Sequence, residues 1–167
     1  MINGINSREM ILEILLEIEE GEHSHVAIRN ALSKYQFLPK QDRAFITRVC
    51  EGTLEYRIQI DYIINSFSKV TVDKMKPAIR EILRSAVYQL KYMDQVPDSA
   101  VCNEAVRLAQ KKGFGTLKGF VNGVLRSIAR GIEEISFDDL SICYSTPQWI
   151  VDQWVEEYGK DKAVRML

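Results

Sequence analysis

The sequence predicts an all-α fold. Apolar residues recur three or four positions apart through most of the chain, which is the spacing that places them on one face of a helix. Only four prolines and nine glycines interrupt these runs. No stretch of five residues alternates polar and apolar side chains convincingly, so no sheet is expected.

The first half of the chain contains three apolar runs. A helix begins at Ser7, a suitable N-cap residue, and ends before Gly21. A second helix covers residues 24–35. From 42 to 67 the apolar pattern continues without a stop, which is long for one globular helix, so Gly52 is expected to kink or break it.

The second half predicts further helices with clear start and stop signals. Pro77 opens the first, because proline is favoured in the first turn of a helix. Helices at 97–113 and 115–131 follow, each ended by a glycine. Thr146 and Pro147 cap and open a last helix that ends at Gly159, and a fragmentary helix follows it.

Composition narrows the class of protein. Hydrophobic residues make up 46% and charged residues 27%, which is ordinary for a soluble globular protein. No apolar run approaches the roughly 18–20 residues of a membrane span, and no signal-peptide pattern opens the chain. The cysteines are odd in number, far apart and outside any metal-ligand spacing, which predicts free thiols in the cytoplasm. They are Cys50, Cys102 and Cys143.

Charge is distributed unevenly along the chain. Residues 38–131 hold sixteen Lys and Arg against nine Asp and Glu, a balance of +7, whereas 1–37 carry −3 and 132–167 carry −5. Three predicted helices in the basic middle place polar or basic residues at four-residue steps, along one face each. Such faces suit phosphate contacts, although merely solvated helix faces carry similar stripes. The stripes are Lys76, Arg80 and Arg84; Asn103, Arg107 and Lys111; and Lys118, Asn122, Arg126 and Arg130.

Glycines and asparagines within these helices need an explanation. Gly115, Gly119 and Gly123 recur every four residues, although each glycine inside a helix costs about 1 kcal/mol relative to alanine. Close packing of another helix is expected at Gly123, and close approach of an RNA backbone is the alternative considered for Gly119. Asn103 and Asn122 lie in otherwise apolar stretches, so each is expected to make a buried hydrogen bond that ties helices together.

No catalytic or metal site is predicted. His23 and His25 flank a helix start without a cysteine or carboxylate constellation, so both are expected at the surface. The sequence offers no phosphate-binding glycine loop, no Ser–His–Asp candidate and no pair of buried carboxylates.

Three motifs resemble those of a known family. Residues 96–126 contain VP, NEAV, LA and FVNGVLR, which resemble the C-terminal half of NusB-type transcription antitermination domains. Residues 42–54 contain DRAF and GTL, which resemble the front of the Sun-type ribosomal RNA cytosine methyltransferases. Residues 144–159 contain YSTPQW, a second tryptophan and YG, and they resemble the segment that leads those enzymes into their methyltransferase domain.

The resemblance covers residues 7–165 and implies a NusB-like bundle of about seven helices. It implies an RNA-binding domain at 1–131, then an acidic connector and the start of a helical linker at 132–167. The implied partners are ribosomal RNA, which the domain would orient, and a methyltransferase domain in the same protein but absent from this sequence. That absent domain would use S-adenosylmethionine and a cysteine nucleophile to methylate cytosine at C5. The last residues lie within an apolar-periodic segment, so a truncated piece of a longer protein is expected.

On this interpretation the chain itself holds no catalytic residue, metal or cofactor. The expected phosphate contacts are Arg80, Arg84, Arg107, Lys111, Lys112, Lys118 and Arg126. Arg43 and Arg57 are candidates for bonding between helices or for docking the missing domain. Trp149 and Trp154 are candidates for docking that domain. Two alternatives stay open: an antitermination module that acts by protein–protein contacts, and an intramolecular scaffold whose tryptophans are left partly exposed.

Overall fold

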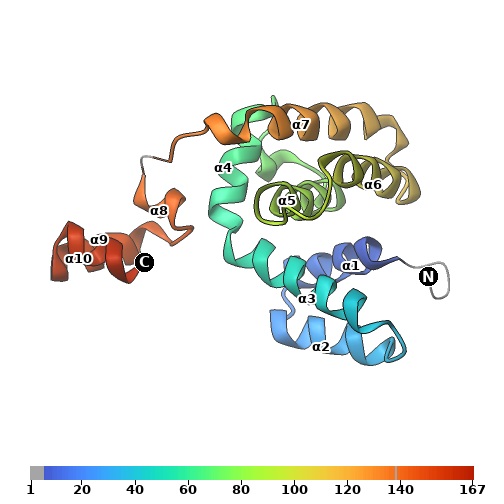
Figure 1. Ribbon diagram of the computed structural model, residues 1–167, viewed down its shortest axis with the longest axis horizontal. Helices are drawn as coiled ribbons and strands as arrows, with labels where there is room; N and C mark the ends of the chain where they lie inside the picture. Colours follow the sequence, from blue (N-terminus) through green and yellow to red (C-terminus); the bar gives the residue numbers. More distant parts are fainter. Residues whose placement is uncertain (1–5, 138) are drawn as a thin grey trace.

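The computed structural model describes residues 6–137 and 139–167, and every secondary-structure element within these ranges is a helix. The all-α prediction is confirmed. Helices α1 to α7 form a bundle, and α8 to α10 lie to one side of it (Figure 1). The α-helices are α1 (Ser7–Glu19), α2 (Ser24–Lys34), α3 (Lys40–Glu55), α4 (Arg57–Phe67), α5 (Pro77–Tyr92), α6 (Asp98–Lys111), α7 (Lys118–Gly131), α8 (Leu140–Cys143), α9 (Gln148–Tyr158) and α10 (Lys160–Met166), with short 3₁₀ turns at Val72–Lys74, Gly115–Leu117 and Ile132–Glu134.

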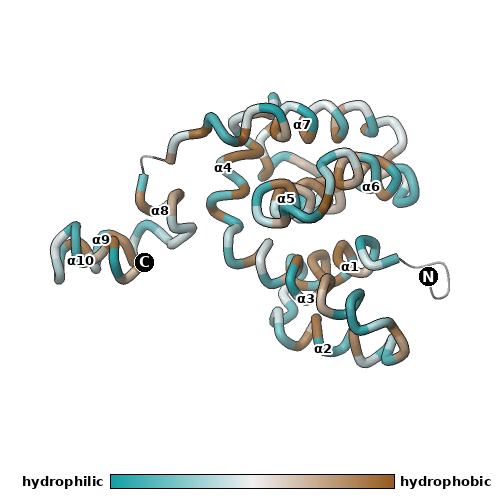
Figure 2. Tube along the Cα trace, viewed as in Figure 1, coloured by the Kyte–Doolittle hydropathy of each residue, from teal (hydrophilic) through white to brown (hydrophobic). Residues whose placement is uncertain are grey.

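Helix α5 occupies the centre of the bundle. Pro77 starts it at the first helical position, and α1, α3, α4, α6 and α7 all pack against it. Its apolar residues Ile79, Ile82 and Leu83 are at most 1% exposed. In Figure 2 the side of α7 that faces α5 and α6 is mostly brown, whereas its outer side is mostly white or teal. The core therefore lies around α5, and the outer faces of α6 and α7 remain available to partners.

The long apolar run at 42–67 is broken, but not at the expected residue. α3 continues through Gly52 to Glu55, and α4 begins at Arg57 after a non-helical Tyr56 (φ −101°, ψ 20°). Gly52 has another role, because a Cβ built there would overlap the ring of Tyr88 on α5. The break expected at Gly52 is thus wrong: this glycine lets α3 and α5 approach closely.

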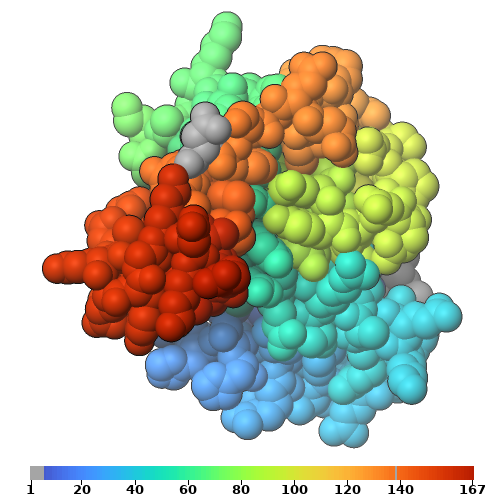
Figure 3. Space-filling view, turned by 60° about the vertical axis from the view of Figure 1, so that its left-hand side comes forward, coloured from blue at the N-terminus to red at the C-terminus, as the bar shows by residue number. Residues whose placement is uncertain are grey.

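Residues 139–167, here called the tail, form a second lobe. α7 ends at Gly131, and a connector that includes a short 3₁₀ turn leads away from it. α8 packs on α4, α9 on α8 and α10 on α9, so the tail extends outward from α4 as a chain of successive contacts. In Figure 3 it stands out beside the bundle as a rounded projection.

Two alanine substitutions should change stability in opposite directions. Gly52→Ala should lower the free energy of unfolding by about 1–3 kcal/mol, because the added methyl overlaps the Tyr88 ring. Gly123→Ala should raise it by about 0.5–1 kcal/mol, because an added Cβ would meet no atom of another element within 4 Å and alanine favours the helix. Urea unfolding followed by circular dichroism measures both. An equal effect of the two substitutions would contradict the close approach of α3 and α5.

Candidate nucleic-acid interface

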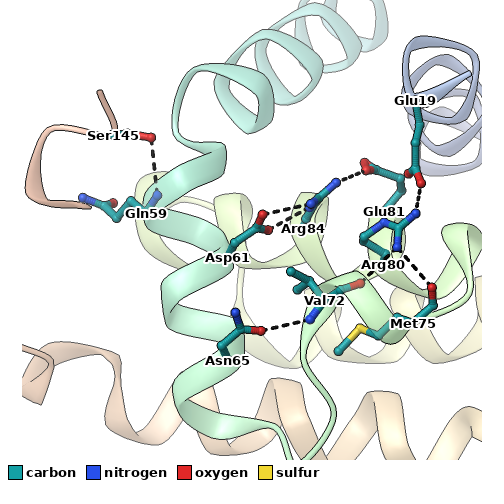
Figure 4. A network of polar contacts seen from close by, with 10 residues as sticks. All are labelled: Glu19, Gln59, Asp61, Asn65, Val72, Met75, Arg80, Glu81, Arg84 and Ser145. Carbon is teal, nitrogen blue, oxygen red and sulfur yellow. Dashed lines mark hydrogen bonds and ion pairs between the residues drawn. The ribbon is translucent and has the colours of Figure 1, made fainter. Parts of the chain in front are cut away.

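The two arginines of the first predicted basic stripe turn into the protein, whereas Lys76 is exposed. Arg84 on α5 is 9% exposed, and its guanidinium donates to both carboxylate oxygens of Asp61 on α4 at 2.8 and 2.9 Å. It also donates to Glu81 at 2.6 Å (Figure 4). Burial lowers the pKa of Arg84, but its bonds to Asp61 outweigh this and raise it. Burial raises the pKa of Glu81, and the neighbouring Arg84 offsets only part of that rise.

Arg80, on the same stripe, is also engaged internally. It donates to the backbone carbonyls of Val72 and Met75 at 3.0 and 3.1 Å and pairs with the carboxylate of Glu19 on α1 (Figure 4). The expectation that Arg80 and Arg84 contact phosphate is therefore corrected. Both arginines hold helices together, because acidic and carbonyl oxygens from distant parts of the chain surround them.

The second and third stripes adjoin each other. α6 and α7 pack side by side, and Arg126 on α7 donates to Asn103 on α6 at 3.0 Å and to Asn122 at 3.2 Å. Asn103 thus forms the expected tie between helices, whereas the bond of Asn122 stays within α7. Asn103 is exposed, however, so the tie lies at the surface and not in the core as expected. Both partners are neutral amides, so neither of them offsets the positive charge of Arg126.

The basic side chains around this tie are exposed. The Arg107 side chain is 73% exposed and makes only a surface ion pair with Glu104 at 3.2 Å. Lys118 is exposed, and no ion pair or hydrogen bond of its side chain is found among the described residues. The six residues that line this surface are here called the α6–α7 basic face. They are Asn103, Arg107, Lys111, Lys118, Asn122 and Arg126.

An acidic residue on α1 borders this face. Glu9 is 5% exposed and accepts from Lys111 at 2.6 Å and from Lys112 at 3.2 Å. Burial would raise the pKa of Glu9, but the two ammonium groups outweigh it and hold the pKa below its usual range. Lys112 also reaches Glu13 at 3.4 Å, so the structure ties this lysine to α1. The Lys111 side chain stays 48% exposed and can still face a ligand.

A groove of about 440 Å³ separates the start of α1 from α6. Arg8 lines it together with Arg107 and Lys111. The Arg8 guanidinium donates to Gln89 at 3.2 Å and lies 5.2 Å from the centre of the Phe45 ring. Sequence reasoning missed Arg8, because it is a single cation in an acidic segment and belongs to no stripe.

The first two glycines of α7 face outward. Gly119 and Gly123 are exposed, and a Cβ at either position would meet no atom within 4 Å. The close helix packing expected at Gly123 is therefore wrong. The open surface at Gly119 leaves the alternative of a close RNA approach untested.

The residues considered for structure or docking fall into three groups. Arg43 bonds α3 to the end of α2, through the carbonyls of Leu32 at 2.9 Å and Tyr35 at 3.2 Å. Arg57 is exposed at the start of α4. Trp149 is 68% exposed and Trp154 is half-buried, both on α9.

The described residues offer little that would support chemistry. They contain no group of three or more His, Cys, Asp or Glu side chains that could hold a metal ion. Cys50 is buried, and burial raises the pKa of its thiol to about 12, which makes it a poor nucleophile. No described helix is both long and apolar enough to cross a membrane.

Comparisons with known proteins agree on the family. The model of the NusB family matches residues 5–130. The probable ribosomal RNA small subunit methyltransferase B of Bacillus subtilis (strain 168) is 34% identical over 167 residues, which cover 95% of this chain and 37% of that protein. The transcription antitermination protein NusB of Dictyoglomus thermophilum is 35% identical over 129 residues, which cover 77% of this chain and 85% of that protein. The chain thus spans little more than a third of the methyltransferase relatives it matches.

Solved structures share the fold. A complex of the antitermination factors NusB and NusE with double-stranded RNA contains a chain that matches with a TM-score of 0.69 at 21% identity, over 75% of this chain and 94% of that one. NusB of T. maritima matches with a TM-score of 0.67 at 24% identity, over 74% of this chain and 88% of that one. At these identities the likeness supports the fold alone.

Glu9→Gln should remove an acid-sensitive part of the stability. Because the folded-state pKa of Glu9 is depressed, its contribution is fully present above the unfolded pKa of about 4.3 and is lost as pH falls through the folded value. At neutral pH we expect a loss on the order of 1 kcal/mol, since Lys111 is half exposed. Urea unfolding between pH 7 and pH 3 should show the gap between wild type and variant closing with acid. A gap that stays constant would contradict the assigned pairing.

Proposed function

Because the chain belongs to the NusB family, we propose that it binds ribosomal RNA and presents it to a methyltransferase domain of the same protein. RNA would contact the α6–α7 basic face. The single observation that carries this proposal is the tie between Arg126 and Asn103, which joins two helical stripes into one exposed cationic surface.

The charges of the basic face support binding to a phosphate backbone. Arg107 and Lys118 are exposed, and Arg126 is fixed by two neutral amides that leave its charge uncompensated. Phosphate contacts of this kind position a nucleic acid without reading its sequence.

The tail favours a methyltransferase parent over a free-standing antitermination factor. The Bacillus subtilis methyltransferase relative aligns with 95% of this chain, whereas the Dictyoglomus NusB aligns with 77% and the family model ends at residue 130. The tail therefore has its counterpart in the methyltransferase relatives. Small-subunit ribosomal RNA is the proposed substrate, cytosine C5 the proposed target and S-adenosylmethionine the proposed methyl donor, all handled by the other domain.

Removing two charges from the basic face should weaken RNA binding in a salt-dependent way. Arg107→Gln/Lys118→Gln should reduce the steepness of the fall in log affinity with log salt by about 0.7–0.9 for each phosphate that the protein no longer neutralises. Fluorescence anisotropy of a labelled small-subunit ribosomal RNA hairpin, measured over a series of salt concentrations, gives this slope. Both side chains are exposed, so the fold should persist.

A matched control changes the same net charge elsewhere. Lys69→Gln/Lys74→Gln removes two exposed lysines between α4 and α5 and should leave the slope unchanged. An equal decrease in the two variants would reject the basic face as the site. If the wild type fails to bind at low salt, the alternative is a module that works by protein contacts. A partner captured equally well with and without ribonuclease would then favour an antitermination-type function.

A further inference from the structure

A buried residue on α4 bonds the tail to the bundle. Gln59 is 3% exposed, and its amide Nε2 donates to the backbone carbonyl of Cys143 at 2.9 Å and lies 3.5 Å from that of Ile142. Its backbone N–H donates to the hydroxyl of Ser145 at 3.4 Å (Figure 4). One residue of the bundle thus meets the end of α8 and the turn that follows it.

The orientation of the Gln59 amide is set from the other side. The hydroxyl of Tyr92 on α5 donates to Gln59 Oε1. Tyr92 is itself fixed by stacking, with ring centres 4.5 Å from Tyr56 and 5.4 Å from Tyr88. Burial raises the pKa of Tyr92 to about 12, so its hydroxyl remains a donor at neutral pH. Because Oε1 accepts from the bundle, the two N–H groups of the amide are left for the tail.

The connector has a second attachment next to this one. The ring of Phe137 meets Tyr62 on α4 edge-on, with centres 6.0 Å apart. Lys91 on α5 lies 5.2 Å from the centre of the Phe137 ring and 5.1 Å from that of Tyr92. These contacts bring the connector to α4 and α5. The hydrogen bonds of Gln59 act further along the chain, at the end of α8, on the backbone carbonyls of the segment from which the rest of the tail continues.

The geometry points to Gln59 as a positioning residue that sets the direction in which the tail leaves the bundle. Since α9 packs on α8 and α10 on α9, an orientation imposed at α8 passes to everything beyond it. This inference rests on the proposed function in one respect. If a methyltransferase domain follows the tail, Gln59 determines where that domain stands relative to RNA on the α6–α7 basic face.

The chain carries its own probe of tail motion. It has two tryptophans, and both lie on α9. Time-resolved tryptophan fluorescence anisotropy therefore reports the tail selectively. The wild type should show the slow rotation of the whole molecule beside the fast local motion of the exposed Trp149, and Gln59→Leu should enlarge the fast component, because the Cys143 carbonyl loses its donor. Gln41→Leu, at an exposed position on α3, is the matched control and should behave as the wild type.

A second variant separates hydrogen bonding from packing. In Gln59→Glu a protonated carboxyl can still donate to the Cys143 carbonyl, whereas a carboxylate would repel it. The fast component should therefore grow as pH rises from 4 to 9, and that of Gln59→Leu should not change with pH. A rigid tail in Gln59→Leu, or a Gln59→Glu tail insensitive to pH, overturns the proposal.

Circular dichroism in the same samples must show an unchanged bundle, and Tyr92→Phe replaces Gln59→Leu if it does not. Tyr92→Phe frees the amide to rotate and should release the tail in the same way. None of these measurements involves RNA. Loss of RNA binding in the basic-face variant and release of the tail in the Gln59 variants can therefore fail or succeed separately.

Discussion

The burial of α5 on all sides is the constraint on which the rest of the bundle depends. Five helices pack around it, so most of its polar side chains are largely shielded from water and need partners in the protein. Arg84 donates to the carboxylates of Asp61 and Glu81, and Gln89 donates to the backbone carbonyl of Ser85. A buried polar group left unpaired costs about 1–3 kcal/mol, and an unpaired charge costs more. The sequence of α5 therefore dictates which residues α4 must present to it.

This constraint explains how far the sequence could be interpreted. Apolar spacing and cap residues are local, and they predicted the helices from α5 to α7 closely, together with a stripe along each helix, whereas it is the fold that brings the stripes of α6 and α7 together. Whether a basic stripe faces water or a carboxylate is decided by residues far along the chain. Asp61 precedes Arg84 by 23 positions, and Glu19 lies on a different helix from Arg80. Four-residue spacing is the same in both cases, so Arg80 and Arg84 were indistinguishable from Arg107.

The glycines show the same limit on prediction from the sequence. Gly52 and Gly123 both lie inside helices, yet the ring of Tyr88 fills the space beside one and nothing approaches the other. Neither outcome could be predicted from the helix that holds the glycine, because the neighbour belongs to another element. Arg8 was missed for the same reason, since only the fold brings the start of α1 against α6.

The contacts of Gln59 have a consequence for how this protein can diverge. On the tail side its amide donates to backbone carbonyls, which every amino acid supplies. Substitutions at positions 142 and 143 can therefore accumulate without loosening the attachment, as long as the turn keeps its shape. For the amide bonds the demand for a particular side chain falls on α4, and the Ser145 hydroxyl on the tail accepts from a backbone N–H that any residue but proline at position 59 would supply, so the two partners need not change together. A joint between two parts of a protein can in this way persist through evolution without leaving a pair of correlated positions to mark it.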